Sequence, residues 1–210
     1  MSSLNDIDRK KYLDRYNARL SEYGYDPRTL GWGGGKDRQS VRFKNLLGVA
    51  GYISTEVSSV LDVGCGFGDL NFYLESFLSS VKYTGLDINK SLIDMAKDVN
   101  NHRGQFYCGT LSELNSIIPS SDVVVESGIF NAALDGEDQI QYIENSLREM
   151  YEKCNYAVAA DFMTDRVDWQ SEGAFHLAPE KALSIALSIG RKVVLRHDYL
   201  PYEYCVYIIK

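Results

Sequence analysis

The spacing of apolar residues divides the chain near residue 58. Before that point, apolar side chains recur at intervals of three and four residues, as they do along one face of a helix. This spacing predicts two helices, marked by Tyr12, Leu13, Tyr16 and Leu20 in the first and by Phe43, Leu46, Leu47 and Ala50 in the second. A turn-rich stretch, YDPRTLGWGGGK, separates them. Its Gly33-Gly34-Gly35 run favours a flexible loop over a phosphate cradle, because no strand precedes it.

From residue 58 onward, short runs of β-branched and aromatic residues alternate with helical patterns. The predicted strands are SSVLDV, VKYTGLDI, GQFYC, SDVVVES, YAVAADF, RKVVLRH and YEYCVYIIK. Apolar stripes that begin at Leu70, Leu92 and Ile140 predict three of the intervening helices, and PEKALSIALSIG predicts a fourth. This alternation predicts a doubly wound α/β fold with a mostly parallel, seven-stranded sheet. The last two strands, joined by DYLP, predict an antiparallel C-terminal hairpin.

The stretch VLDVGCGFGD joins the first predicted strand to the next helix. Its glycines, Gly64, Gly66 and Gly68, follow a G-x-G-x-G pattern and leave a bare backbone beside the amino end of that helix. In an open α/β sheet, ligands bind at such a turn, beyond the carboxyl ends of the strands. A dinucleotide site would have glycine in place of Asp69, so the pattern disfavours one. Asp62 would repel a pyrophosphate and suits a ligand with an ammonium group.

A second acid ends the strand VKYTGLDI at Asp87, about twenty residues after the glycines, where a carboxylate can accept both ribose hydroxyls. A ribose and a cationic amino-acid tail without phosphate describe S-adenosylmethionine (SAM). On these residues the chain resembles the class I, Rossmann-like SAM-dependent methyltransferases over roughly residues 58–210. The apolar pattern predicts a helical cap or extension over residues 1–55, and the resemblance implies a SAM-binding domain over residues 56–210.

The chain is similar, more closely, to a bacterial branch of small-molecule methyltransferases. Three segments carry this similarity: Gly31-Trp32 with Gln39, Arg42 and Phe43; Ser127-Gly128-Ile129-Phe130-Asn131; and Arg196-His197-Asp198-Tyr199 with Tyr202-Glu203. The branch implies an oxygen or nitrogen of a small-molecule acceptor as the site of methylation.

The resemblance implies where the cofactor would bind. The methionine part would lie over the three glycines with Asp62 near its amino group, Asp87 would hold the ribose, and Ile88 would pack on the adenine. Gly109-Thr110 stands where the family has Gly-Asp, so a hydroxyl or backbone group would substitute there. The full set of implied cofactor residues is Asp62, Gly64, Cys65, Gly66, Gly68, Asp87, Ile88, Thr110, Leu111, Glu126, Ser127, Gln39 and Arg42. For Gln39 and Arg42, a solvated helix face is the alternative.

Methyl transfer needs in-line positioning and exclusion of water, and a general base only for a hydroxyl or protonated amine. His197, oriented by Asp198, is the first candidate for that base and Glu126 the second, although a structural histidine is an equal alternative. Acceptor selection is expected in residues 23–36, 129–137 and 164–178, with Tyr25, Trp32, Phe130, Asn131, His176 and Tyr199 as candidate contacts. Trp32 could equally anchor the core.

Composition disfavours several classes of partner and site. The net charge of −7 disfavours a nucleic-acid partner, and no segment is apolar over a membrane-spanning length. Cys65, Cys108, Cys154 and Cys205 are far apart, which disfavours a metal site and predicts reduced core thiols in a cytoplasmic protein. We expect a monomer or homodimer. The alternatives are a nucleic-acid or protein methyltransferase and a non-catalytic SAM-binding subunit, although the latter would tend to lose the glycines or acids.

Overall fold

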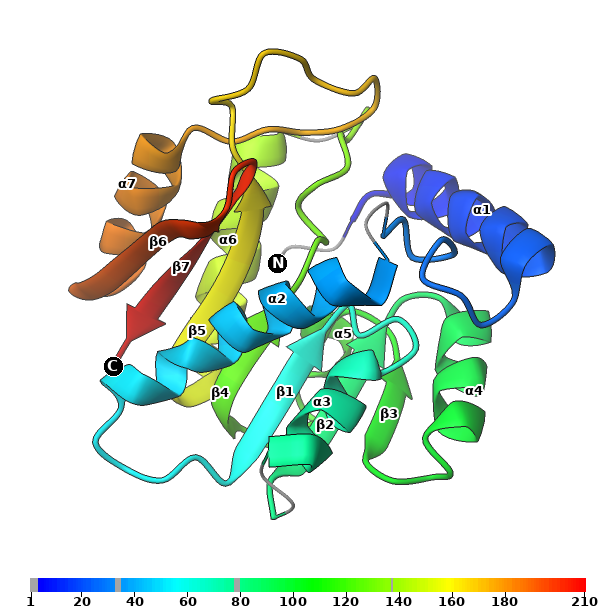
Figure 1. The fold of residues 1–210 in the computed structure, drawn as a ribbon, viewed down its shortest axis with the longest axis horizontal. Helices are drawn as coiled ribbons and strands as arrows, with labels where there is room; N and C mark the ends of the chain where they lie inside the picture. Colours follow the sequence, from blue (N-terminus) through cyan, green and yellow to red (C-terminus); the bar gives the residue numbers. More distant parts are fainter. Residues whose placement is uncertain (1–3, 33–34, 78–79, 137) are drawn as a thin grey trace.

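The computed structural model describes residues 4–32, 35–77, 80–136 and 138–210, so Gly33 and Gly34 of the predicted loop lie outside the described residues. The strands are β1 (Ser59–Val63), β2 (Lys82–Asp87), β3 (Gln105–Cys108), β4 (Ser121–Glu126), β5 (Cys154–Met163), β6 (Lys192–Leu200) and β7 (Glu203–Ile209). They form one seven-stranded sheet in the order β3-β2-β1-β4-β5-β7-β6 (Figure 1). The predicted α/β fold is confirmed.

Helices precede the sheet and alternate with its strands. They are α1 (Asp6–Tyr23), α2 (Gly35–Leu47), the 3-10 helix η1 (Gly48–Tyr52), α3 (Asp69–Phe77), α4 (Lys90–Val99), α5 (Leu111–Leu114), α6 (Gln139–Lys153) and α7 (Pro179–Ile189). The short α5 is not predicted by periodicity, because it consists of one turn held by a capping box between Thr110 and Glu113. In the described part of the chain, no helix combines the length and apolar character that crossing a membrane requires.

The strand directions follow the prediction, with one correction near the C-terminus. β1 pairs in parallel with β2 and β4, and β7 is antiparallel to both of its neighbours, β5 and β6. The DYLP segment is not a loop, because β6 continues to Leu200 through a shift of register between Arg196 and Leu200. The turn lies at Pro201 and Tyr202.

Alternating side chains of each central strand face two separate apolar layers. Val60 packs into the layer covered by α2, α3 and α4, whereas the next residue, Leu61, packs into the layer covered by α6 and α7. Figure 1 shows α2 and α3 in front of the sheet and α6 behind it. Three of the cysteines are buried thiols as predicted, but Cys108 is exposed because it ends β3 at the sheet edge.

Helix α1 lies apart from these layers, beyond the carboxyl ends of the central strands (Figure 1). Its amino end is fixed by Asp8, which is fully buried. The Asp8 carboxylate accepts hydrogen bonds from the backbone N–H groups of Asp135 at 2.7 Å and Gly136 at 3.1 Å. The Asn5 side chain also donates to it, at 2.9 Å. This carboxylate therefore joins α1 to the segment that follows β4.

We expect Asp8→Ala to loosen α1, because the substitution leaves two backbone donors without their partner. The free energy of unfolding should fall by about 1–3 kcal/mol, and amide exchange over residues 4–32 should accelerate. Urea unfolding and hydrogen–deuterium exchange measure the two effects. Asp14→Ala is the control, because Asp14 forms an exposed pair with Lys10 on the same helix. Equal behaviour of the two variants would contradict the anchoring role.

Candidate functional site

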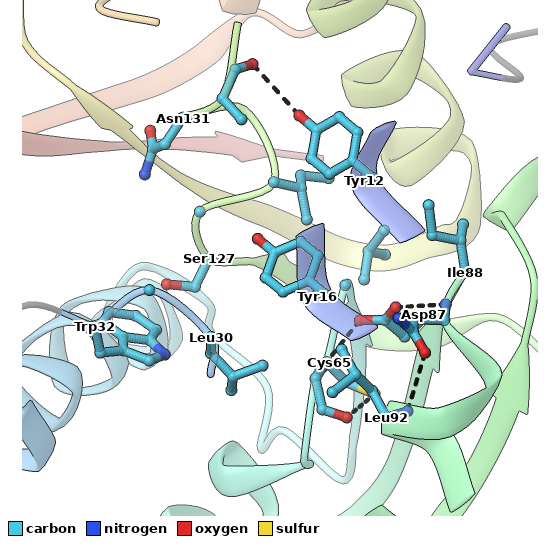
Figure 2. Close-up of a pocket in the computed structure, with 18 of the residues that line it drawn as sticks. Tyr12, Tyr16, Leu30, Trp32, Cys65, Asp87, Ile88, Leu92, Ser127 and Asn131 are labelled. Atoms are coloured by element: carbon cyan, nitrogen blue, oxygen red, sulfur yellow. Dashed lines mark hydrogen bonds between the residues drawn. The ribbon is translucent and has the colours of Figure 1, made fainter. Parts of the chain in front are cut away.

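A cavity of about 610 Å³ opens between α1 and the carboxyl ends of β1, β2 and β4. Its volume lies in the range of small-molecule pockets, and its position is where open α/β sheets bind ligands. Figure 2 shows side chains that enter it from opposite sides: Tyr12 and Tyr16 from α1, Trp32 and Leu30 from the segment after α1, and Asp87 from the end of β2. Helix α1 therefore forms the roof of the cavity.

The turn after β1 presents bare backbone to this cavity. Gly64 has φ +77°, and a Cβ there would lie 2.2 Å from Cγ2 of Ile129. Gly66 has φ +54°, and a Cβ there would lie 2.9 Å from Cδ1 of Leu30. Both positions thus require glycine for conformation and for space. Gly68 differs from our prediction, because it does not line the cavity; a Cβ there would meet the Phe106 ring at 2.6 Å.

Two buried carboxyl groups flank the glycine turn. Asp62 accepts a hydrogen bond from the Tyr83 hydroxyl at 2.7 Å, and burial raises its pKa to about 7. Asp87 accepts from the backbone N–H groups of Gly66 at 3.1 Å and Asn89 at 2.8 Å. Burial raises the pKa of Asp87 to about 6, although the two N–H groups oppose the shift. Each carboxylate keeps lone pairs for a ligand in the cavity.

The cavity brings together most of the residues selected from the sequence. Those that line it are Trp32, Gln39, Arg42, Asp62, Gly64, Cys65, Gly66, Asp87, Ile88, Thr110, Leu111, Ser127 and Asn131. Those that do not line it are Tyr25, Gly68, Glu126, Phe130, His176, His197, Asp198 and Tyr199.

The predicted His197–Asp198 pair is wrong. Asp198 accepts two hydrogen bonds from the Arg196 guanidinium, at 3.1 and 2.8 Å, and leaves the imidazole without a carboxylate partner. His197 is exposed on β6, and its ring lies 5.6 Å from the Tyr204 ring. Because β5 and β7 separate β6 from β4, three strand spacings of about 4.8 Å place His197 roughly 14 Å from the end of β4.

The predicted role of Glu126 is also corrected, since this residue lies inside the protein rather than in the cavity. It is fully buried, and its carboxylate accepts from the backbone N–H groups of Asp161 at 2.8 Å and Ile129 at 3.1 Å. Burial and the nearby Asp161 charge raise its pKa well above the usual range. The carboxyl group therefore fixes the turn that follows β4 and is not a candidate base.

Three of the four remaining acceptor candidates outside the cavity have structural partners. Phe130 is buried and stacks on Phe162, with 5.4 Å between the ring centroids. The Tyr25 hydroxyl donates to Asp69 at 2.8 Å. His176 places Nδ1 2.7 Å from the carbonyl oxygen of Thr164. Tyr199, on β6, packs against the apolar layer under α2, and its buried hydroxyl has no hydrogen-bond partner among the described residues.

Arg42 connects helix α2 to three strands at the floor of the cavity. Its guanidinium forms a buried ion pair with Glu203 at the start of β7 and lies 3.6 Å from Asp161 of β5. Asp161 in turn accepts from the Ser127 hydroxyl, just after β4, at 2.5 Å. Trp32 stacks over the guanidinium at 4.6 Å. The solvated alternative for Arg42 is therefore wrong, because this arginine is buried and paired.

Gln39, one turn before Arg42 on the same helix, is buried as well. Its side-chain amide donates to Asp69 at 3.0 Å, which joins α2 to the first residue of α3.

Sequence reasoning missed the contribution of α1. The residues of this helix that line the cavity are Tyr12, Leu13, Arg15, Tyr16 and Arg19. Their signal was the aromatic stripe at helical spacing, flanked by two arginines four residues apart. The periodicity identified the helix but not the surface against which that face would pack.

Comparison with known proteins supports one function class. A family model described as a methyltransferase domain matches residues 60–153. A protein of Mycobacterium tuberculosis that carries a provisional methyltransferase name is 25% identical over 159 residues, which cover 72% of this chain and 93% of that protein.

Solved structures share the whole fold. Magnesium protoporphyrin IX methyltransferase from Synechocystis, with bound SAM, has a TM-score of 0.67 and 15% identity, and the match covers 100% of this chain and 99% of that one. The plantazolicin methyltransferase BpumL, in complex with a desmethylplantazolicin analogue and S-adenosylhomocysteine (SAH), has a TM-score of 0.66 and 17% identity, with coverage of 97% and 98%. The chain therefore has the fold of these methyltransferases from end to end.

We expect Arg42→Met to destabilise the protein by about 3–5 kcal/mol, because the carboxyl groups of Glu203 and Asp161 lose a buried cation. Because burial raises the pKa of Asp161, the loss should be larger at pH 8 than at pH 5, where protonation of that carboxyl removes part of the uncompensated charge. Urea unfolding at both pH values measures it. Arg148→Met is the control, because Arg148 forms an exposed pair with Glu144 and should contribute less than about 1 kcal/mol. If Arg42→Met lowered the free energy of unfolding no more than the control, and equally at both pH values, the proposed role of the Arg42–Glu203–Asp161 network would be contradicted.

Proposed function

We propose that this chain is a class I SAM-dependent methyltransferase that methylates an oxygen or nitrogen atom of a small-molecule acceptor; the domain match and the fold support this proposal. The observation that carries the proposal is the composition of one cavity. The cavity combines bare glycine backbone and two buried carboxyl groups at one end with space for an acceptor under the roof formed by α1. A cavity closed by a helix in this way suits a small molecule more than a polymer.

The cofactor would occupy the β1–β2 end of the cavity. Its methionine part would lie over Gly64 and Gly66, with the ammonium group near Asp62. Its ribose hydroxyls would donate to Asp87, whose carboxylate is held in place by two backbone N–H groups. Ile88 and Leu111, which both line the cavity, would pack on the adenine ring.

The chain's own residues would contribute mainly positioning. Bound SAM supplies a methyl group that is already activated by the positive sulfur. The described lining contains no histidine, so the roof and the turn after β4 would act by orienting the acceptor and excluding water. Figure 2 shows Tyr16 pointing its hydroxyl toward Ser127 across this space. Tyr16 and Ser127 are therefore our candidates for orienting the acceptor.

A cytoplasmic location would fit this function. All four cysteines are free thiols, and burial raises the pKa of the Cys65 thiol, which disfavours the reactive thiolate.

We expect SAM and SAH to bind and NAD not to bind. Asp87→Ala should weaken SAH binding by about 1–3 kcal/mol, roughly 5- to 150-fold, because charged hydrogen bonds to the ribose are lost. Isothermal titration calorimetry with each ligand measures both effects. Asp94→Ala is the matched control, since Asp94 is an exposed partner of Lys90. NAD binding without a SAM signal would overturn the proposed function, and unchanged affinity in a folded Asp87→Ala variant would overturn the ribose contact.

We also expect the affinity for SAH to fall as the pH is lowered from 8 to 5. Because the pKa values of Asp62 and Asp87 are raised to about 7 and about 6, the free protein keeps protons on these groups at mildly acidic pH. A ligand that needs both carboxylates must displace those protons. Calorimetry in buffers of different ionisation enthalpy should therefore detect proton release near pH 6. 5′-Methylthioadenosine, which lacks the ammonium group, should release fewer protons, and a pH-independent affinity would contradict both contacts.

A further inference from the structure

Two arginines in the roof of the cavity lack the acid partner that eight other arginines have, and unlike the exposed Arg191 they are half-buried. Arg15 and Arg19 lie one turn apart on α1, are half-buried and line the cavity. Neither guanidinium forms an ion pair or hydrogen bond with any residue that the structure describes. Eight other arginines each pair with an acid, namely Arg9, Arg28, Arg38, Arg42, Arg103, Arg148, Arg166 and Arg196.

The missing partners of Arg15 and Arg19 are informative, because carboxylates are available to the other cations of α1. The chain carries a net charge of −7, and α1 pairs its other cations, Arg9, Lys10 and Lys11, with carboxylates. A half-buried guanidinium without a partner loses hydration and gains no compensating charge, which is unfavourable unless a ligand supplies the anion. The cavity face of α1 is thus built to receive negative charge.

The two arginines face different ends of the cavity. An added Cβ at Gly31 would lie 2.9 Å from Nη1 of Arg19, and the neighbouring Leu30 covers Gly66. Arg19 therefore lies toward the proposed cofactor end. An added Cβ at Gly173 would lie 3.7 Å from Nη2 of Arg15. Arg15 therefore lies against the segment after β5, where an acceptor would enter.

Other donors share the acceptor end with Arg15. The Asn131 side-chain oxygen accepts from the backbone N–H of Met163 at 3.1 Å, which fixes the amide, and its Nδ2 lies 3.7 Å from the Cβ position of Gly128 in the cavity lining. The Tyr16 hydroxyl forms no hydrogen bond with a described residue and points into the same space (Figure 2).

The acids around this end do not cancel the charge of Arg15. Glu172 is exposed to water, and no ion pair forms between it and Arg15. Glu203 is paired with Arg38 and Arg42, and Asp161 lies beside Arg42. Glu149 has a partner of its own. The acceptor end thus offers one unpaired cation, Arg15, and two hydrogen-bond donors.

We propose that the methyl acceptor carries a carboxylate and that Arg15 binds it, with Asn131 and Tyr16 as neighbouring donors. This inference rests on the proposed function, since it assigns the acceptor class of the same cavity. A planar carboxylate matches the fork of one guanidinium in geometry and charge. A phosphate dianion would need a second cation at the same point, whereas Arg19 faces the other end.

The test compares benzoate with benzamide, which have nearly the same shape and differ in charge. Ligand-observed NMR titrations on the full-length chain, with and without saturating SAH, measure both dissociation constants. We expect benzoate to bind at least tenfold more tightly than benzamide. Arg15→Gln should remove this preference and Arg15→Lys should keep part of it. Arg191→Gln, which changes an exposed arginine outside the cavity, should leave it unchanged.

Several results would overturn the proposal. One is equal binding of benzoate and benzamide to the wild-type protein. Another is a preference for benzoate that persists in a folded Arg15→Gln variant. Phenyl phosphate binding more tightly than benzoate would refute the carboxylate. If Arg15→Gln weakened SAH but not 5′-methylthioadenosine, Arg15 would bind the cofactor's own carboxylate instead. A benzoate preference in a protein that binds no SAH would support the Arg15 site and refute the proposed function, so the two failures are distinguishable.

Discussion

The ion pair between Arg42 and Glu203 is the contact on which the cavity depends. It joins α2, which precedes the sheet in the chain, to β7, which is among the last segments added to it. Through Asp161 and Ser127 the same guanidinium also reaches β5 and the turn after β4. A buried charge tolerates few arrangements, because each partner must stay within hydrogen-bond distance. The network therefore fixes where the floor of the cavity lies relative to the glycine turn.

The parts of the fold that depend on local pattern could be predicted from the sequence. Short runs of β-branched residues in β1 and β4 identify buried strands. The glycines with Asp62 and Asp87 identify the ligand-binding edge, because a strand end and its turn are adjacent in sequence. The motif around Trp32 and Arg42 was noticed as well, but its meaning required the structure. Glu203 lies 161 residues away from Arg42, and no periodicity indicates that two such residues pair.

The failed predictions share a physical reason, which is that a residue's neighbours across the sheet decide its role. The sequence places His197 near the ligand edge because β6 ends there, yet β7 lies between β5 and β6 and moves His197 outward. The sequence makes Glu126 a candidate base, but its carboxylate accepts hydrogen bonds from backbone N–H groups of the adjacent strand and turn. Helix α1 was predicted correctly as a helix, and only its docking through Asp8 shows that it covers the site.

The distribution of charge inside the cavity follows from this assembly and explains how an acidic chain can admit an anion. The sheet contributes the buried acids Asp62 and Asp87 at one end, which suit a positively charged cofactor. An anionic acceptor would be repelled by those acids if the cavity held no cation. Helix α1 contributes Arg15 and Arg19 from the opposite side and covers the cavity, which lowers the effective dielectric constant there and strengthens each charge interaction. Since the acids come from the sheet and the arginines from α1, the docking of α1 completes the electrostatic field that would hold donor and acceptor side by side.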